Sequence, residues 1–256
     1  MLKNNLIALQ TIITKEILRF SRIWVQTIIP PVITVVLYFL IFGHLIGPRI
    51  GPMNGIPYIN FIMPGLIMLA VIQNSYANVV SSFYGSKFQK NIEEMLVSPI
   101  PNSIILMGFV GGGVARGMIV GFAVTLVSFM FTDINPQHIG LTICISLLTS
   151  ILFALAGFIN GIYAQSFDDI SIIPTFVLTP LTYLGGIFYS ITLLPEFWQN
   201  ASLFNPVLYM ISAFRYAILG VSDIPLLTAF SIIIAFIAGL FFYSLSLLNR
   251  GIGIKS

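Results

Sequence analysis

The chain has 256 residues, of which 57% are hydrophobic and only 7% are charged, and this composition excludes an ordinary water-soluble protein. The formal net charge of +3 is small and scattered, which argues against a nucleic-acid partner, and the single cysteine excludes an internal disulfide. Long apolar stretches leave no room for a soluble catalytic domain, which usually needs roughly 100 residues. We therefore expect an all-α integral membrane protein with no metal site.

Residues 1–22 are predicted to form an amphipathic helix. Apolar residues recur there at steps of three and four, which places them on one face. Lys15, Arg19 and Arg22 share the other face. Such a helix lies in the membrane surface with its basic side towards anionic headgroups.

Six later stretches are long enough to cross the roughly 30 Å hydrocarbon core, which takes about 20 apolar residues. A Gly/Pro-rich loop, residues 43–57, separates the first two stretches, and a short charged helix, residues 87–98, follows the second. The predicted spans are residues 24–42, 58–82, 104–131, 139–163, 172–191 and 225–248.

The region 195–222 is apolar but is broken by Asn205-Pro206 and carries Arg215. Counting it as a seventh span would place the C-terminal Arg250 and Lys255 outside, against the positive-inside rule. We therefore predict a re-entrant helical pair that dips into the outer leaflet, with both termini in the cytoplasm. The basic residues on the cytoplasmic side are then Lys3, Lys15, Arg19, Arg22, Lys87, Lys90, Arg250 and Lys255.

A run of glycines opens the third span. Gly111 to Gly113 resemble a phosphate-binding loop, but the Gly-Lys-Ser/Thr ending that holds phosphates and magnesium is missing, so this chain is expected to bind no nucleotide. Gly113, Gly117 and Gly121 form a stripe at four-residue spacing, which lets helices approach closely in lipid. We expect the stripe to pack helices, and contact with a substrate is the alternative.

Polar residues inside the spans leave two interpretations open. Asn74 and Asn78 lie on one face of the second span, where they form either hydrogen bonds between helices or the polar wall of a substrate path. Arg116 in the third span is expected to extend its side chain to the headgroups, and a role as an intramembrane functional charge is the alternative.

Two blocks of sequence resemble the membrane subunits of ABC-2 family transporters, and the likeness extends over essentially the whole chain. One block is the cytoplasmic stretch Asn91-Ile-Glu-Glu-Met-Leu-Val-Ser-Pro-Ile100. The other is Pro180-Leu-Thr-Tyr-Leu-Gly-Gly-Ile-Phe188, continued by Leu194-Pro195, Trp198, Asn205-Pro206, Tyr209 and Arg215. The chain is most similar to members of this family that are permeases of the bacterial inner membrane.

The resemblance implies a homodimer that docks two copies of a separate ABC-type ATP-binding subunit. The partner subunit, not this chain, then binds ATP and Mg²⁺, and the chain itself is not an enzyme. It also implies an exporter of a lipid, glycan or drug-like amphipathic substrate that works among membrane lipids. The helix at 87–98 becomes the coupling helix, with contacts from Lys87, Lys90, Glu93, Glu94, Met95 and Leu96. The residues assigned to a gate or substrate path are Asn74, Asn78, Tyr183, Gly185, Gly186, Phe188, Trp198, Asn205 and Arg215.

Two other classes of membrane protein fit the sequence less well. An ion-coupled secondary transporter usually keeps a carboxylate inside the membrane, whereas all eight Asp and Glu residues are expected in loops or at span ends. A lipid-modifying enzyme could use Asp168 and Asp169 as an acidic pair, but no His or Arg cluster accompanies them, and a solvated turn is favoured.

Overall fold

The computed structural model describes residues 2–132 and 136–253. This part of the chain consists of helices and short connections, and its only paired β residues are the isolated bridge Met53–Ile56. The predicted all-α fold is therefore confirmed there. Lys255, which entered the prediction of orientation, lies outside the described residues.

The first long rod is longer than expected. Helix α1 (Leu2–Arg22) is followed by α2 (Trp24–Tyr38), which continues through the π-helix η1 (Phe39–Ile46) into α3 (Gly47–Ile50). The predicted span ended at residue 42, whereas the helical rod extends to Ile50. Gly43 and Gly47 carry no side chain, so the rod packs closely on Ile59 and Tyr58 at the start of the next helix. Gly51, at φ +80°, then ends it in a conformation that favours glycine.

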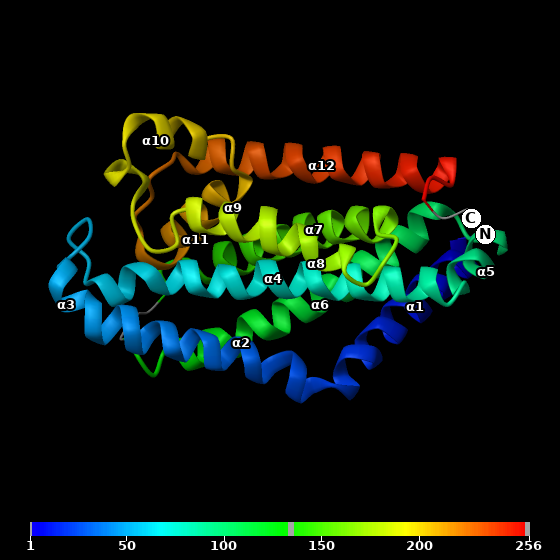
Figure 1. Ribbon diagram of the computed structural model, residues 1–256, viewed down its shortest axis with the longest axis horizontal. Helices are drawn as coiled ribbons and strands as arrows, with labels where there is room; N and C mark the ends of the chain where they lie inside the picture. The colour runs from blue at the N-terminus through cyan, green and yellow to red at the C-terminus, as the bar shows by residue number, and fades with distance from the viewer. Residues whose placement is uncertain (1, 133–135, 254–256) are drawn as a thin grey trace.

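The remaining helices alternate in direction along the bundle (Figure 1). Within the described residues, five rods are long and apolar enough to span a membrane: Trp24–Ile50, α4, α6, α7 and α12. A sixth, shorter apolar rod, Asp169–Leu184, is built from α8, η2 and α9. The bounds are α4 (Tyr58–Phe88), α5 (Asn91–Val97), α6 (Asn102–Ser128), α7 (Ile139–Tyr163), α8 (Asp169–Ile173), η2 (Pro174–Leu178), α9 (Thr179–Leu184), η3 (Ile191–Leu193), α10 (Glu196–Ser202), α11 (Pro206–Leu219) and α12 (Leu226–Arg250).

The sixth rod is shorter than the predicted span at 172–191 because two glycines end it. Gly185 follows α9, and Gly186 has φ +77°, a backbone conformation that terminates helices. The chain after Gly186 returns to α4, where the carbonyl oxygen of Ile187 would lie 2.8 Å from a Cβ on Gly65. Gly65 therefore allows this close backbone contact.

The two ends of the bundle differ in what they carry (Figure 1). The start of α1, helix α5 and the end of α12 lie together, and we name this the α5 end. Helices α3, α10 and α11 lie at the opposite end, the α3 end. Helices α10 and α11 are bent by 88° against each other, and both lie at the α3 end. A re-entrant pair and a span broken in the middle share this geometry, so the re-entrant pair stays a prediction.

Helix α4 lies at the centre of the bundle, with 23 of its 31 residues buried. Glycines on α6 allow α6 to pack closely against α4 on one side and against α1 on another. A Cβ on Gly117 would overlap the hydroxyl of Ser75, and one on Gly121 would lie 2.6 Å from Val71. A second glycine face of α6 receives α1: a Cβ on Gly108 would lie 2.5 Å from Ile12. The glycines of α6 that face α4 are Gly113, Gly117 and Gly121, and those that face α1 are Gly108, Gly111 and Gly112.

Candidate functional site

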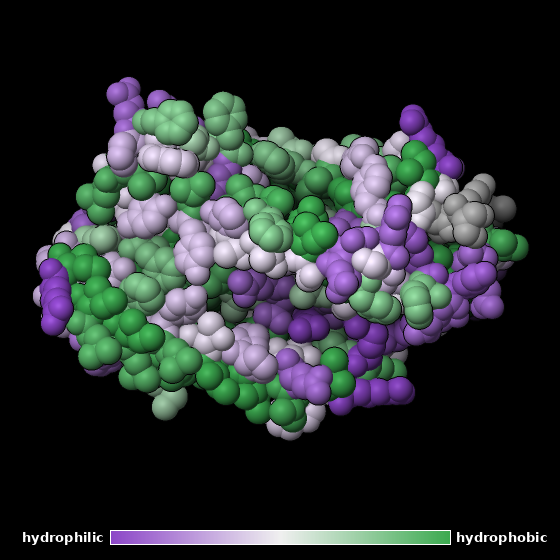
Figure 2. Space-filling model, viewed as in Figure 1, coloured by the Kyte–Doolittle hydropathy of each residue, from purple (hydrophilic) through white to green (hydrophobic). Residues whose placement is uncertain are grey.

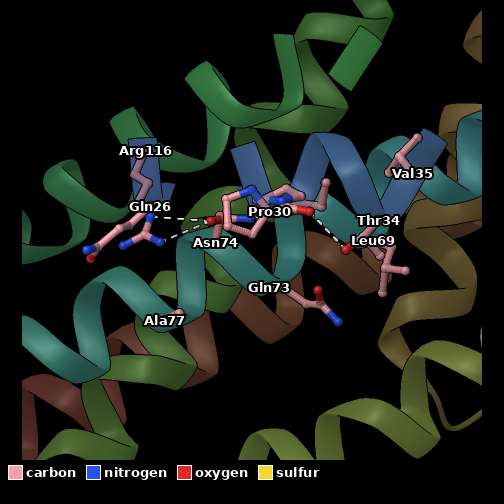
Figure 3. Close-up of a pocket in the computed structure, with 11 residues that line it drawn as sticks. Gln26, Pro30, Thr34, Val35, Leu69, Gln73, Asn74, Ala77 and Arg116 are labelled. Atoms are coloured by element: carbon pink, nitrogen blue, oxygen red, sulfur yellow. Dashed lines mark hydrogen bonds between the residues drawn. The ribbon is translucent and has the colours of Figure 1, made fainter. Parts of the chain in front are cut away.

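A pocket of about 280 Å³ opens between α2, α4 and α6 (Figure 3). Its polar lining comes from Gln26, Gln73, Asn74 and Arg116. Figure 2 shows hydrophilic surface recessed beside the apolar strip of α2. The apolar part of the lining is Pro30, Pro31, Val35, Leu69, Ala70 and Ala77, with Thr34 also at the wall.

The Arg116 side chain extends into this pocket, where it contacts a polar group inside the bundle, and its expected contact with headgroups stays a prediction. Its Nε and Nη2 donate to the side-chain oxygen of Asn74 at 3.3 and 3.2 Å. Asn102 and Ser128, the ends of α6, are each about 20 Å away along the helix axis. An arginine side chain cannot cover that distance, so the nearest polar group inside the bundle becomes its partner.

Asn74 is held in place to receive this arginine. Its amide nitrogen donates to the carbonyl of Ala70 at 3.0 Å, which leaves the amide oxygen facing Arg116. Both the ion pairs found among residues 2–132 and 136–253 involve other arginines. Arg116 therefore has an amide partner and no acidic partner in the described part of the chain.

A second buried polar cluster joins α1 to α4, and sequence reasoning missed its central residue, Glu16. The Glu16 side chain is 0% exposed, and its carboxylate accepts hydrogen bonds from Ser82 at 2.6 Å and from Arg19 at 3.3 Å. Arg19 also donates to the backbone and side-chain oxygens of Asn78 at 2.9 and 2.8 Å. Arg19 thus turns into the bundle, and Asn78 lies in a contact between helices. The spacing of Glu16 and Arg19, three residues apart on one helix, was the available signal.

Helix α5 exposes its two glutamates, whereas Met95 and Leu96, which were also expected to contact a partner, turn towards the core. Ile92 is fully buried, and Met95 and Leu96 pack against the same core, so these three apolar residues anchor the helix. Glu93 and Glu94 are exposed at the α5 end. Two apolar side chains remain uncovered nearby, Phe88 with 65% and Val97 with 88% exposure. The exposed surface formed by Phe88, Glu93, Glu94 and Val97 is named the docking face below.

The two lysines assigned to coupling occupy distinct positions. Lys87 donates from Nζ to the carbonyls of Ile162 and Ala164 at 2.8 and 2.7 Å, where α7 ends. Lys90 is exposed and has φ +61°, in the tight turn between α4 and α5. Lys87 therefore ties α4 to α7, whereas Lys90 shapes the turn before the docking face.

Arg215 forms the centre of a buried cluster at the α3 end. Its guanidinium donates to the carbonyl of Gly186 at 2.6 Å, pairs with Asp223 at 3.3 Å and lies 4.0 Å from the ring centroid of Phe61. Asp223 in turn accepts from the hydroxyl of Ser190 at 2.7 Å. The segment from Gly186 to Ser190 is thereby fixed on top of α4.

The other residues assigned to a path include a helix cap, a packed aromatic side chain and an exposed one. Asn205 caps α11 by accepting from the backbone N–H of Val207, and it donates to Leu181. Tyr183 packs against Phe188 with ring centroids 6.0 Å apart, and Trp198 is exposed on α10. The structure thus brings Asn74 into the pocket, puts Asn78 at the contact with α1, and gathers the remaining path residues at the α3 end.

The acidic pair forms a turn. The Asp169 carboxylate accepts from the backbone N–H groups of Gln165 and Ser166 at 2.9 and 3.0 Å, and Asp168 is exposed. Within the described residues no group of three or more His, Cys, Asp or Glu side chains could hold a metal ion. The pair has the surroundings of a solvated turn.

Comparison with known proteins places this architecture among transporters. The ABC-2 type transporter family matches residues 7–219. The chain is 57% identical over 250 residues to the inner membrane transport permease YadH of Escherichia coli K12, which covers 98% of both chains. It is 25% identical over 209 residues to nodulation protein J of Sinorhizobium fredii, covering 81% of this chain and 80% of the relative. Nodulation protein J of Rhizobium leguminosarum bv. viciae is 23% identical over 216 residues, 84% of this chain and 83% of the relative.

Proposed function

Because the chain belongs to the ABC-2 type transporter family, we propose that it is the permease subunit of an ATP-driven exporter in a bacterial inner membrane. Two copies would form the membrane part, and each would dock one separate ABC-type subunit that binds ATP and Mg²⁺. Both termini and the α5 end face the cytoplasm in this proposal. The cargo is a lipid, a glycan or a drug-like amphipathic molecule.

The docking face is the single observation that carries the proposal. Glu93 and Glu94 project from a helix of seven residues whose apolar side, around Ile92, is seated in the core. A helix anchored in this way transmits force into the bundle when a partner presses on it. Exposed Phe88 and Val97 beside the two carboxylates give the surface the apolar and charged parts that protein interfaces combine.

The surface of α2 supports a second copy of the chain as the partner within the membrane. Ile29, Ile33 and Leu37 are exposed along this helix, and the recess beside it is polar (Figure 2). Polar groups facing lipid are costly, so a facing copy that encloses the recess as a path is favoured. In the proposed cycle, closure of the two ATPases tilts rigid helices and opens that path towards the α3 end, where Arg215 holds the loop after α9 in place.

A proton- or ion-coupled secondary transporter is the second candidate, and buried Glu16 is the observation that favours it. The carboxylate is the kind of group that such transporters use as a relay. Its ion pair with Arg19 and its hydrogen bond from Ser82 are equally the features of a contact that fastens α1 to α4. The ATP-driven reading is preferred because Glu16 lies outside the pocket lining.

The test is to co-express the chain with each ABC-type ATP-binding protein of its own genome and to purify the complex through a tag on the permease. We expect two permease and two ATPase chains, with ATP hydrolysis only in the presence of the partner. Hydrolysis by the isolated chain, or failure of all of these ATP-binding proteins to co-purify, would contradict the proposal. Transport by the purified chain without any ATPase, driven by an imposed proton gradient, would establish the secondary transporter instead.

A further inference from the structure

Arg116 is a cation with no acidic partner among residues 2–132 and 136–253. It lies midway along α6, in the pocket between α2 and α4, and both ion pairs in the described part of the chain are made by other arginines. A charge at this depth is expensive, and where one occurs it usually faces a cavity and a partner. The protein partner is the neutral amide of Asn74, which offers hydrogen bonds but no negative charge.

The geometry of the guanidinium leaves part of it free for a ligand. Nε and Nη2 are both taken by the oxygen of Asn74, and no acceptor for Nη1 is found within residues 2–132 and 136–253. Asn74 is itself fixed by its hydrogen bond to Ala70. The arginine is thus held in one orientation beside the pocket, with donors left for an incoming anion.

The rest of the pocket has two chemically distinct sides. Gln26 adds an amide group beside Arg116, and Gln73 lines the pocket farther from it (Figure 3). Pro30, Val35 and Leu69 supply an apolar wall next to them. A ligand that fills both sides carries a charged head and an apolar chain.

We propose that this pocket binds the anionic headgroup, a phosphate or a carboxylate, of an acidic amphiphile that is the transported cargo. That the ligand is transported rests on the proposed function. Binding of the ligand is a property of this chain alone. Arg116 provides the charge, Asn74 orients it, and the apolar wall of α2 receives the first part of the ligand's apolar chain. A zwitterionic lipid fits less well because its own cation would face Arg116.

The experiment uses the full chain in detergent and counts retained lipids by native mass spectrometry. The probes are phosphatidylglycerol, oleate, phosphatidylcholine and inorganic phosphate. We expect phosphatidylglycerol and oleate to bind at least tenfold more tightly than phosphatidylcholine. Millimolar inorganic phosphate is expected not to displace them, because a free phosphate gains nothing from the apolar wall. Displacement by inorganic phosphate, or equal binding of phosphatidylcholine, would overturn the amphiphile assignment.

Four variants separate the charge of Arg116 from its structural role. Arg116→Gln and Asn74→Asp both remove the uncompensated charge, the second by placing a carboxylate against the guanidinium, and both should weaken binding about tenfold. Arg116→Lys keeps the charge and should lose less than threefold. Arg49→Gln removes an exposed arginine of α3 and serves as the matched control. If Arg116→Gln binds phosphatidylglycerol as the wild type does, or if Arg49→Gln loses as much, the inference is wrong.

Binding and transport fail in different ways in this design. A chain that retains acidic lipids through Arg116 but does not assemble with an ATPase contradicts the proposed function and leaves the binding site standing. A chain that assembles and couples to the ATPase, yet shows no preference for acidic lipids, contradicts the inference alone.

Discussion

The carboxylate of Glu16 accepts a hydrogen bond of 2.6 Å from the hydroxyl of Ser82, across 66 positions of sequence. This contact fastens the N-terminal helix to the centre of the bundle. The Cβ and Cγ atoms of Glu16 also pack where Gly112 of α6 leaves space, so the Glu16 side chain contacts both α4 and α6. Helix α1 is therefore a packed part of the membrane domain and not only a helix at its surface.

Glu16→Ala should destabilise the protein by about 2 kcal/mol, because Ser82 loses its acceptor and Arg19 its ion-pair partner. The cost is reduced because Arg19 is partly exposed and keeps its hydrogen bonds to Asn78. The measurement is the thermal unfolding midpoint of the purified chain in detergent. Adding Arg19→Ala to Glu16→Ala should lower the midpoint further, because Arg19 also donates to the backbone and side-chain oxygens of Asn78. Equal midpoints for wild type and Glu16→Ala would show that the contact contributes nothing.

Replacing both Glu93 and Glu94 by Ala should lower the amount of co-purified ATPase about tenfold, because the docking face loses its charges while Ile92 keeps the helix seated. Expression and membrane insertion should not change. Glu196→Ala, on exposed α10 at the opposite end, is the matched control. A double variant that recovers the ATPase at the wild-type level would remove the docking assignment.

Asp223→Asn should loosen the segment after α9, because Arg215 then loses its charged partner and Ser190 a strong acceptor. The readout is a cysteine introduced by Ile187→Cys in a Cys144→Ser background, labelled with a membrane-impermeant maleimide. The Ile187 side chain is fully buried, so the label should react slowly in the parent and at least tenfold faster with Asp223→Asn. Unchanged labelling would mean that the ion pair does not hold this segment.

Gly117→Ala should destabilise the bundle by about 1–3 kcal/mol, because its Cβ would overlap Ser75 on α4. The matched control is Gly239→Ala on α12, where a Cβ meets nothing within 4 Å and the change should be neutral or slightly stabilising. Ser75→Ala should restore part of the loss by removing the hydroxyl. The comparison is made by thermal unfolding, and equal effects of the two glycine variants would exclude close packing at Gly117.

Both ends of the bundle can be assigned to a side of the membrane with single cysteines in the Cys144→Ser background. A cysteine at Glu94 should react with an impermeant reagent only after the inner membrane is opened. A cysteine at Phe204, which is exposed at the α3 end, should react in spheroplasts directly. The reverse pattern would place the docking face on the wrong side for a cytoplasmic ATPase.

The apolar pattern predicted where helices lie, because a long stretch without charges has few alternatives to a membrane helix. It did not predict which polar side chains meet. Arg116 could reach either the headgroups or Asn74, and only the depth and rotation of α6 against α4 decide between them. The contact between Glu16 and Ser82 depends in the same way on how α1 and α4 pack, which no local spacing encodes.

Helix α5 shows a different limit of sequence reasoning. Its composition predicted a short helix over residues 87–98 with charged and apolar sides, whereas α5 covers Asn91–Val97 and Lys87 and Phe88 belong to α4. In a helix of seven residues, however, the apolar side can be seated in the core or offered to a partner, and the pattern is the same in both cases. The burial of Ile92 settles which side faces inward. Exposed Phe88 and Val97, which flank the helix, then become the apolar part of the docking face.

Lys87 links the ends of helices α4 and α7. Its backbone belongs to α4, and its ammonium donates hydrogen bonds to carbonyls at the end of α7. The final turns of both helices are therefore held together next to the turn to α5. In the proposed cycle, a push from the ATPase on α5 would therefore act on α4 and α7 together. Both helices extend to the α3 end, where Phe61 of α4 packs against Arg215.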